Sequence, residues 1–76
     1  MSYRVELWLQ AEEVLAGLSE EGRREVMELI ATVLVERGTW PAPGGWETAE
    51  RFGSHSWITF AAYRDGIDVV RVGWAG

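Results

Sequence analysis

The sequence predicts an α+β protein in which an antiparallel sheet carries a helical hairpin on one face, in the order β-α-α-β-β-β. Residues 3–9 alternate between two faces, as a strand with one buried face does. The segment that follows places apolar residues three and four apart, which is typical of amphipathic helices. Residues 56–74 then hold two β-branched and aromatic runs around Asp65-Gly66, a pattern that predicts a β-hairpin.

Length and composition limit the class of protein. A chain of 76 residues is expected to form a single domain, residues 1–76, because this is near the lower size limit for an independent core. Hydrophobic residues make up 47% and include five tryptophans, which favours a packed core over disorder. The absence of cysteine excludes a disulfide scaffold and a cysteine-based metal site.

Charge and hydropathy limit the partners. The formal net charge of −5 disfavours generic nucleic-acid binding, which depends on neutralising phosphates. The first six residues lack the pattern of a signal peptide, and no apolar run is long enough to span a bilayer. We therefore expect a soluble, cytoplasmic protein that uses no cofactor, no metal and no membrane contact.

The first half of the chain predicts one strand and two helices. The strand turns two sets of side chains to opposite faces, which are Tyr3, Val5, Leu7 and Leu9 on one and Arg4, Glu6 and Trp8 on the other. A short helix follows, whose apolar face is Ala11, Val14, Leu15 and Leu18. Ser19 is predicted to cap a second helix that ends near Arg37, with Gly38 in the left-handed position after it.

The second half predicts a loop and three consecutive strands. Residues 39–46 contain both prolines and two glycines, so they form a loop, which Trp40 and Trp46 are expected to hold against the body. Residues 47–52 form a short strand, and residues 53–55 a tight link into the main hairpin. Because these three strands follow one another directly, they are expected to pair antiparallel.

The hairpin pattern also predicts which face is buried. If Asp65 and Gly66 form the turn, Trp57 lies opposite Trp74, and Phe60 lies opposite Arg71. The bulkier face is expected to lie under the helices and contains Trp57, Ala61, Tyr63, Val70, Val72 and Trp74. The other face is expected to stay open and contains Ile58, Phe60, Ala62, Ile67, Val69 and Arg71.

The order of elements resembles the RelE/ParE superfamily of toxin–antitoxin toxins. The closest local likeness is the segment Asp-Gly-Ile-Asp-Val-Val-Arg-Val-Gly, residues 65–73, which resembles the terminal strand of that family. The resemblance implies a toxin-like module that acts through the open face of its sheet. It also implies a protein partner on that face, because antitoxin peptides bind such toxins there.

The resemblance has consequences for catalysis. In the ribonuclease branch, basic residues on the open face grip messenger RNA at the ribosome and stabilise charge during cleavage. Of these, Arg51 and Arg71 lie where the family often has basic residues. Ser56 and Trp57, and then Trp74 and Ala75, occupy positions where the family usually has Arg or a basic pair. The resemblance therefore implies a toxin that is degenerate at its catalytic positions, whereas the gyrase-inhibiting branch does not need those residues.

Two candidate residues each allow two interpretations. His55, the single histidine, is either a general base with Glu50 or Ser54 nearby, or a solvated turn residue. Arg71 interrupts an apolar strand and is either the centre of a partner-binding surface or a side chain that extends to water at the sheet edge. Together with Arg51 these are the candidate catalytic residues. The predicted partner-binding surface is Trp8, Ile58, Phe60, Val69 and Arg71.

Two functions remain open at this point. The first is a toxin-like module whose open face binds an antitoxin-like peptide or helix, or a second copy of the chain, with RNA or the ribosome as a weaker alternative. The second is a non-enzymatic acidic binding protein on the same scaffold, such as an immunity protein or an antitoxin-like inhibitor. The order of elements favours the first, and the acidic balance favours the second.

Overall fold

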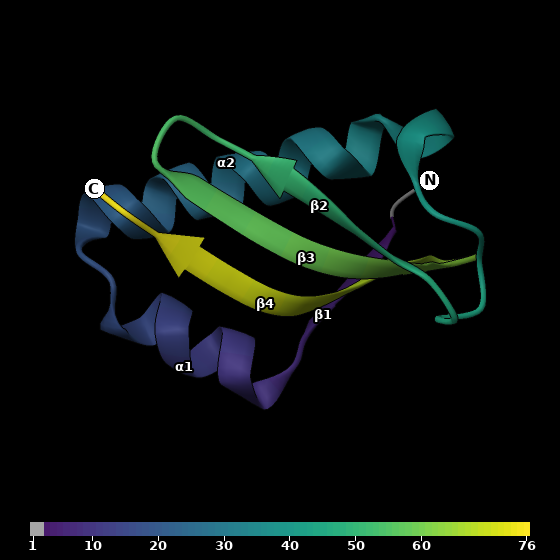
Figure 1. Cartoon of the computed structure of the whole chain (residues 1–76), viewed down its shortest axis with the longest axis horizontal. Helices are drawn as coiled ribbons and strands as arrows, with labels where there is room; N and C mark the ends of the chain where they lie inside the picture. Colours follow the sequence, from purple (N-terminus) through teal and green to yellow (C-terminus); the bar gives the residue numbers. More distant parts are fainter. Residues whose placement is uncertain (1–2) are drawn as a thin grey trace.

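A computed structural model describes residues 3–76 and confirms the predicted α+β class and element order (Figure 1). Residues 1 and 2 of the predicted 1–76 domain lie outside the described range. In chain order the elements are β1 (Arg4–Leu7), α1 (Leu9–Gly17), α2 (Glu20–Val35), the short 3₁₀ helix η1 (Arg37–Thr39), β2 (Thr48–Phe52), β3 (Ser56–Tyr63) and β4 (Gly66–Trp74).

The strands form one sheet in the order β1-β4-β3-β2. As predicted, β2, β3 and β4 pair antiparallel. β1 joins the other side of β4 in parallel, so the sheet as a whole is mixed. β1 reaches only from Arg4 to Leu7, opposite Gly66 to Val69, so on that side the last part of β4 has no neighbouring strand.

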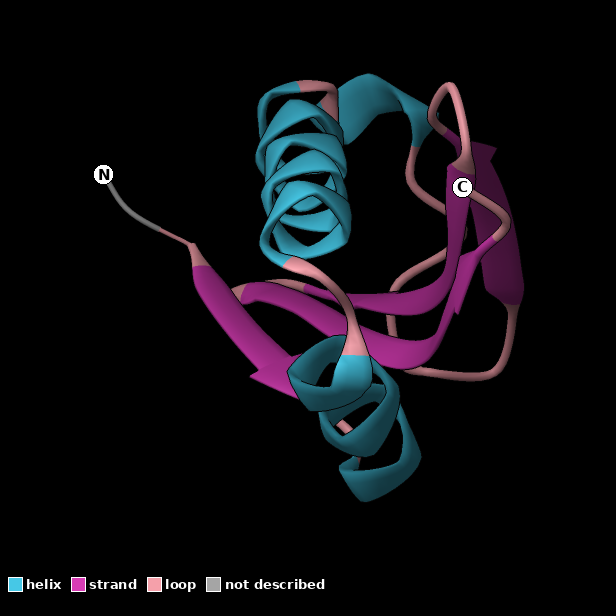
Figure 2. Cartoon of the chain, turned by 90° about the vertical axis from the view of Figure 1, so that its left-hand side faces the viewer, coloured by secondary structure: helices cyan, strands magenta, loops and turns pink. Residues whose placement is uncertain are grey.

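The two helices occupy different places around the sheet (Figure 2). α2 crosses one face, and α1 packs beside β4 where β1 has ended. Ser19 caps α2 as predicted, because its hydroxyl accepts a hydrogen bond from the Gly22 N–H at 3.1 Å. The helix ends at Val35, and Gly38 lies in η1 without the predicted left-handed conformation. No helix within residues 3–76 is long and apolar enough to cross a membrane.

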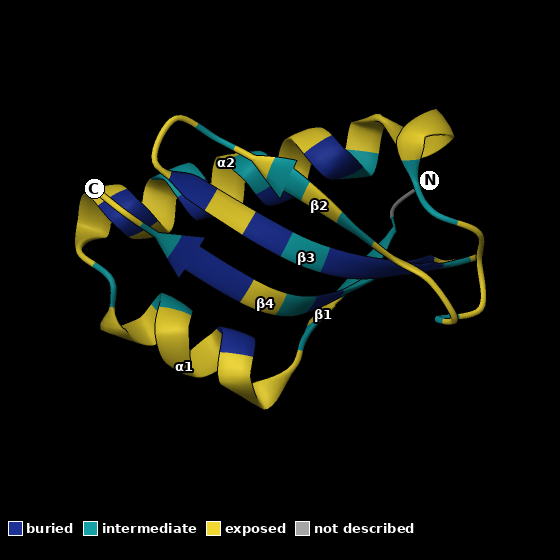
Figure 3. Ribbon diagram, in the orientation of Figure 1, coloured by how far each residue is buried: buried dark blue, intermediate teal, exposed yellow. Residues whose placement is uncertain are grey.

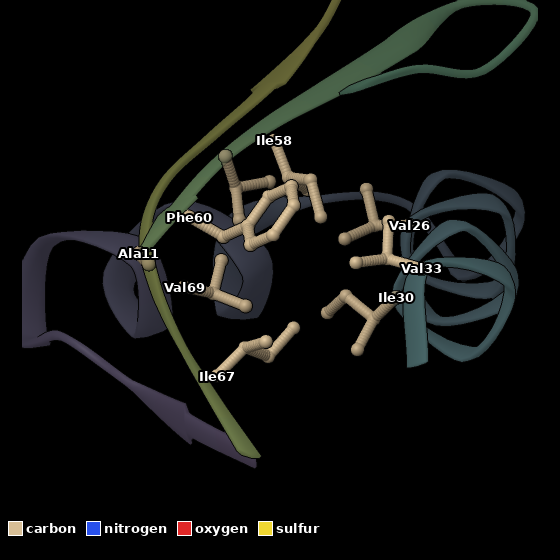
Figure 4. Close-up of a cluster of buried hydrophobic side chains, with 9 residues drawn as sticks. Ala11, Val26, Ile30, Val33, Ile58, Phe60, Ile67 and Val69 are labelled. Carbon is tan, nitrogen blue, oxygen red and sulfur yellow. The ribbon is translucent and has the colours of Figure 1, made fainter. Parts of the chain in front are cut away.

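The core lies between α2 and the sheet face that was predicted to be open. Figure 4 shows Ile58, Phe60 and Val69 pointing toward α2, and all three have no exposed surface. They meet three buried side chains of α2, which are Val26, Ile30 and Val33. The predicted assignment of the two faces is therefore wrong for these residues, and for Ala62 and Ile67, which are also buried there.

A β-bulge between β3 and β4 explains a second error. Phe60 pairs with Val69, but the next residue, Thr59, pairs with Arg71, so one extra residue lies in β4 at Val70. An extra residue reverses the inward and outward alternation beyond it. Arg71 is therefore turned away from the core side, although Val69 lies on it.

The bulge also separates the two tryptophans that were predicted to pair. Trp57 lies opposite Gly73, whereas Trp74 lies opposite Ser56. The indole of Trp74 packs at the start of α2, where a Cβ added to Gly22 would lie 3.2 Å from it. Trp57 faces the other way and is 36% exposed. The predicted buried Trp57–Trp74 pair is wrong.

The loop before β2 is held by one of the two predicted tryptophans. The indole N–H of Trp40 donates a hydrogen bond of 2.7 Å to the Val33 carbonyl at the end of α2. Trp46 is 91% exposed and does not anchor the loop. Gly44 and Gly45, just before it, adopt positive φ angles of 118° and 80°, which glycine takes at little steric cost.

Candidate functional site

The sheet face turned away from α2, called the open face below, is the candidate functional site. Figure 3 shows that the first half of β3, Ser56 to Phe60, alternates between buried residues and more exposed residues, and the more exposed ones lie on this face. It is built from alternate residues of β2 and β3 and, past the bulge, from Arg71 and Gly73 of β4. Arg71 was predicted to lie on the open face and does so, but with different neighbours.

An exposed aromatic row crosses one end of the open face. Phe52 of β2 lies opposite Trp57 of β3, which in turn lies opposite Gly73 of β4. Gly73 has no side chain, and the indole of Trp57 occupies the space that a Cβ would need. Phe52 is 69% exposed and Val14 of α1 is 41% exposed at the far side of the row. An apolar strip of this kind on a small protein is typical of an interaction surface.

A row of polar residues lies next to the aromatic row. Glu50, Thr59 and Arg71 are consecutive neighbours across β2, β3 and β4 and line one shallow hollow. Two strand spacings separate the Cα atoms of Glu50 and Arg71 by roughly 10 Å. Within residues 3–76, the guanidinium of Arg71 makes no hydrogen bond or ion pair. It is an exposed cation that is available to a ligand.

Trp8 lies on the open face, as predicted, but its polar group is already bonded. Its indole N–H donates to the Asp68 carboxylate at 3.2 Å, and Arg4 Nη1 lies 3.0 Å from the other oxygen of that group. Arg4 also bonds Asp65 at 3.1 Å and holds the pKa of that carboxyl below its ordinary value. This network fastens β1 to the β3–β4 turn, and the sequence spacing alone did not indicate it.

Arg51 lies on the other face and is not brought together with Arg71. Its guanidinium donates to the carbonyl groups of Thr39 and Glu50 and lies 5.6 Å from the centre of the Phe60 ring. These contacts close the edge of the core and fasten the loop before β2. The guanidinium of Arg51 therefore lies on the α2 side of the sheet, apart from Arg71 on the open face.

His55 lies in a clasp between the β2–β3 turn and α2. The Glu25 carboxylate accepts hydrogen bonds from the Ser56 hydroxyl and from the His55 backbone N–H, the latter at 2.9 Å. The His55 Nδ1 lies 3.6 Å from the second oxygen of Glu25, and its ring meets Trp74 edge-on at 5.9 Å. From the sequence, Glu50 and Ser54 were the expected neighbours of His55, whereas Glu25, which is 30 residues away, was not expected there.

The hydrogen bonds of this clasp hold the β2–β3 turn against α2. The Ser56 hydroxyl donates a hydrogen bond to the Glu25 carboxylate, and Ser56 is only 2% exposed, so a substrate cannot reach it as a nucleophile. His55 lies on the α2 side of the sheet, whereas Arg71 lies on the open face. In the described part of the chain, no group of three or more His, Cys, Asp or Glu side chains could hold a metal ion.

The clasp predicts a specific acid sensitivity. The hydrogen bond from Ser56, followed by that from the His55 N–H, lowers the pKa of the Glu25 carboxyl below its ordinary value of 4.5. A carboxyl group whose pKa is lowered in the folded state stabilises the protein at pH values above its ordinary pKa. This stabilisation is lost as the pH falls through the folded-state pKa. We expect Glu25→Gln to lower the free energy of unfolding at neutral pH, with the deficit shrinking below pH 4.5.

Urea unfolding followed across this pH range measures the effect. Glu28→Gln, on the exposed side of the same helix, is the matched control and should follow the wild type at every pH. A Glu25→Gln deficit that stays constant from neutral to acid pH would show that the carboxylate charge does not contribute to the clasp.

The partner-binding residues predicted from sequence need correction. Ile58, Phe60 and Val69 lie in the core, so they cannot form a contact surface. Besides Trp8, the exposed apolar residues of the open face are Phe52 and Trp57, which the sequence did not indicate for this surface. One signal was present, because a glycine inside a strand often marks close approach by a neighbouring group, and Gly73 has that role for Trp57.

Comparison with solved structures identifies a protein of similar fold. A chain from the crystal structure of an archaeal RelE–RelB complex from Pyrococcus horikoshii OT3 superposes with a TM-score of 0.67 and 17% sequence identity. The match covers 100% of this chain and 98% of that chain. No protein-family model matches the sequence, and a search of curated proteins finds no match. The fold is therefore RelE-like.

Proposed function

We propose that this chain is a toxin-like module of a toxin–antitoxin system that acts through its open face and is bound there by a protein partner. The likeness to a chain of the archaeal RelE–RelB complex supports a RelE-like fold and a protein partner. The observation that carries the proposal is the exposed aromatic row beside Arg71, a cation with no partner within residues 3–76.

The surface favours a particular kind of partner. Phe52 and Trp57 offer exposed aromatic area, and aromatic and arginine side chains are the usual anchors of protein interfaces. A segment with apolar side chains and one acidic residue would cover the aromatic row and pair with Arg71. An antitoxin-like peptide or helix of this composition is the proposed partner.

We propose further that the module is not a competent ribonuclease. Stabilising the charge that develops at a phosphate needs several converging donors. Arg71 lies in the same polar row as Glu50, and the negative charge of Glu50 would repel a phosphate group. Arg51 faces the opposite side, and His55 is held in the Glu25 clasp. A target that is bound rather than cut suits this arrangement.

The second candidate function is a non-enzymatic acidic binding protein, such as an immunity protein or an antitoxin-like inhibitor. The observation that favours it is the net charge of −5, which would complement a basic target. Under this hypothesis the chain protects a cell and does not inhibit growth.

Inducible expression in a bacterial host separates the two functions. We expect the wild-type chain to arrest growth, and Arg71→Glu to relieve the arrest because it reverses the cation of the acting surface. Arg64→Glu is the matched control, since Arg64 is exposed in the β3–β4 turn and also has no ionic partner among residues 3–76. Circular dichroism of both purified variants verifies folding.

The outcomes are distinct. Growth that continues at full expression of the wild-type chain would reject the toxin module and favour the inhibitor. Growth arrest with site-specific cleavage of messenger RNA, seen by primer extension, would contradict the loss of nuclease activity. Equal relief by Arg64→Glu and Arg71→Glu would show that net charge, and not the open face, determines the effect.

A further inference from the structure

We propose that the groove between α1 and the open face is a binding site for a small apolar monocarboxylate. This goes beyond the function proposed above and does not depend on it. The groove is open to solvent and has a volume of about 420 Å³, within the usual range of roughly 300–1,000 Å³ for small-molecule sites. It is lined by Gln10, Val14, Trp57, Arg71, Val72 and Gly73.

The groove is a consequence of the short first strand. β1 ends opposite Val69, so no strand pairs with the last part of β4 on that side. α1 fills this place, and Ala11, the one fully buried residue of the helix, joins the core there. Val14 follows one turn later near the open face and forms a wall of the groove. A helix beside a sheet leaves a hollow that another strand would have closed.

Trp57 and Gly73 supply a rigid aromatic wall. The indole lies against the bare backbone of Gly73, in the space that a larger residue would fill. This contact restricts the ring, so little side-chain freedom remains to be lost when a ligand packs against it. Val14 and Val72 complete an apolar interior that fits an aryl or alkyl group.

The polar groups at the rim define the charge of the ligand. The bulge at Val70 turns Arg71 to this face, and its guanidinium can bond a carboxylate through two parallel hydrogen bonds. Gln10 adds an amide that can donate to the same group. A neutral ligand would leave Arg71 unpaired. A phosphate dianion would meet one cation and the nearby negative charge of Glu50, so a monocarboxylate suits the rim best.

Titration with phenylacetate tests the site, with phenylacetamide as the neutral probe of the same shape. In ¹H–¹⁵N spectra of the whole chain we expect saturable shifts at the Trp57 indole and the Gln10 side chain. Loss of a charge-assisted pair should weaken the amide about tenfold relative to the acid. N-acetylphenylalanine carries the same carboxylate and ring together with an amide, as the end of a peptide chain does. If it binds as well as phenylacetate, the site accepts a peptide chain end; if only phenylacetate binds, the site takes a free acid.

Two variants and one control variant locate the interaction. Arg71→Gln should reduce binding of phenylacetate to the level of phenylacetamide and leave binding of the amide unchanged, whereas Arg64→Gln should bind both as the wild type does. Val14→Glu, at an exposed position, should abolish binding of both by placing a carboxylate in the groove. Equal affinity for acid and amide, an unaltered Arg71→Gln, or the absence of saturable shifts at Trp57 would overturn the proposal.

Discussion

Replacing Phe60 with alanine is expected to lower the free energy of unfolding by about 3–5 kcal/mol, the usual cost of truncating a buried aromatic residue. Phe60 is the largest fully buried side chain, and it points at α2 from the middle of β3. Small domains have a total stability of about 5–15 kcal/mol, so this loss would remove a large part of the stability of the chain. Chemical denaturation followed by tryptophan fluorescence measures it.

Phe52→Ala is the matched control for this prediction. Phe52 is the same residue type in the neighbouring strand, but it lies on the open face and is 69% exposed. Its removal should change stability by less than about 1 kcal/mol, because little of the ring leaves water on folding. If Phe52→Ala destabilised the protein as much as Phe60→Ala, the assignment of the two sheet faces would be wrong.

A methyl group at Gly66 should strongly disrupt the sheet. The backbone of β1 passes so close to Gly66 that an added Cβ would overlap the Arg4 carbonyl group. Overpacking usually costs about 1–3 kcal/mol, and here the obstacle is backbone that cannot rotate away. We expect Gly66→Ala to exceed that range and to separate β1 from β4, which loss of amide protection along Arg4–Leu7 would reveal.

Gly17→Ala makes the same chemical change without the overlap. Gly17 is the last residue of α1 and has no atom within 4 Å of an added Cβ. Alanine is the better helix former by roughly 1 kcal/mol, so stability should stay constant or rise slightly. A Gly66→Ala protein as stable as Gly17→Ala, with β1 still protected, would contradict the close approach of the two strands.

Local patterns predicted the elements well because each depends on nearby residues. Alternation in residues 3–9 predicted β1, and its inward Val5 and Leu7 do pack against the core. The predicted end was wrong, because Leu9 begins α1 and is 69% exposed. Ser19 predicted the start of α2, since capping involves only the next three residues. The RelE-like order followed from these elements, and the comparison by structure confirms that fold at 17% identity.

The same local patterns misplaced the turn of the hairpin. Asp65-Gly66 was expected to form the turn through positive φ, but the turn residues are Arg64 and Asp65, with Tyr63 opposite Gly66. Gly66 does not adopt positive φ, and its missing side chain instead admits β1. The sequence marked the right glycine, but the requirement comes from a strand about 60 residues earlier, which no local rule includes.

The candidate site shows which features follow from the sequence and which depend on the tertiary structure. The sequence by itself determined the strands and helices, the position of the basic residue Arg71 within an apolar strand, and the negative net charge of the chain. Tertiary structure decided which face is open, because the bulge at Val70 changes the alternation by one residue and both faces of the hairpin are apolar enough to be buried. It also decided that Glu25 would hold His55, since only the packing of α2 on β3 brings them together.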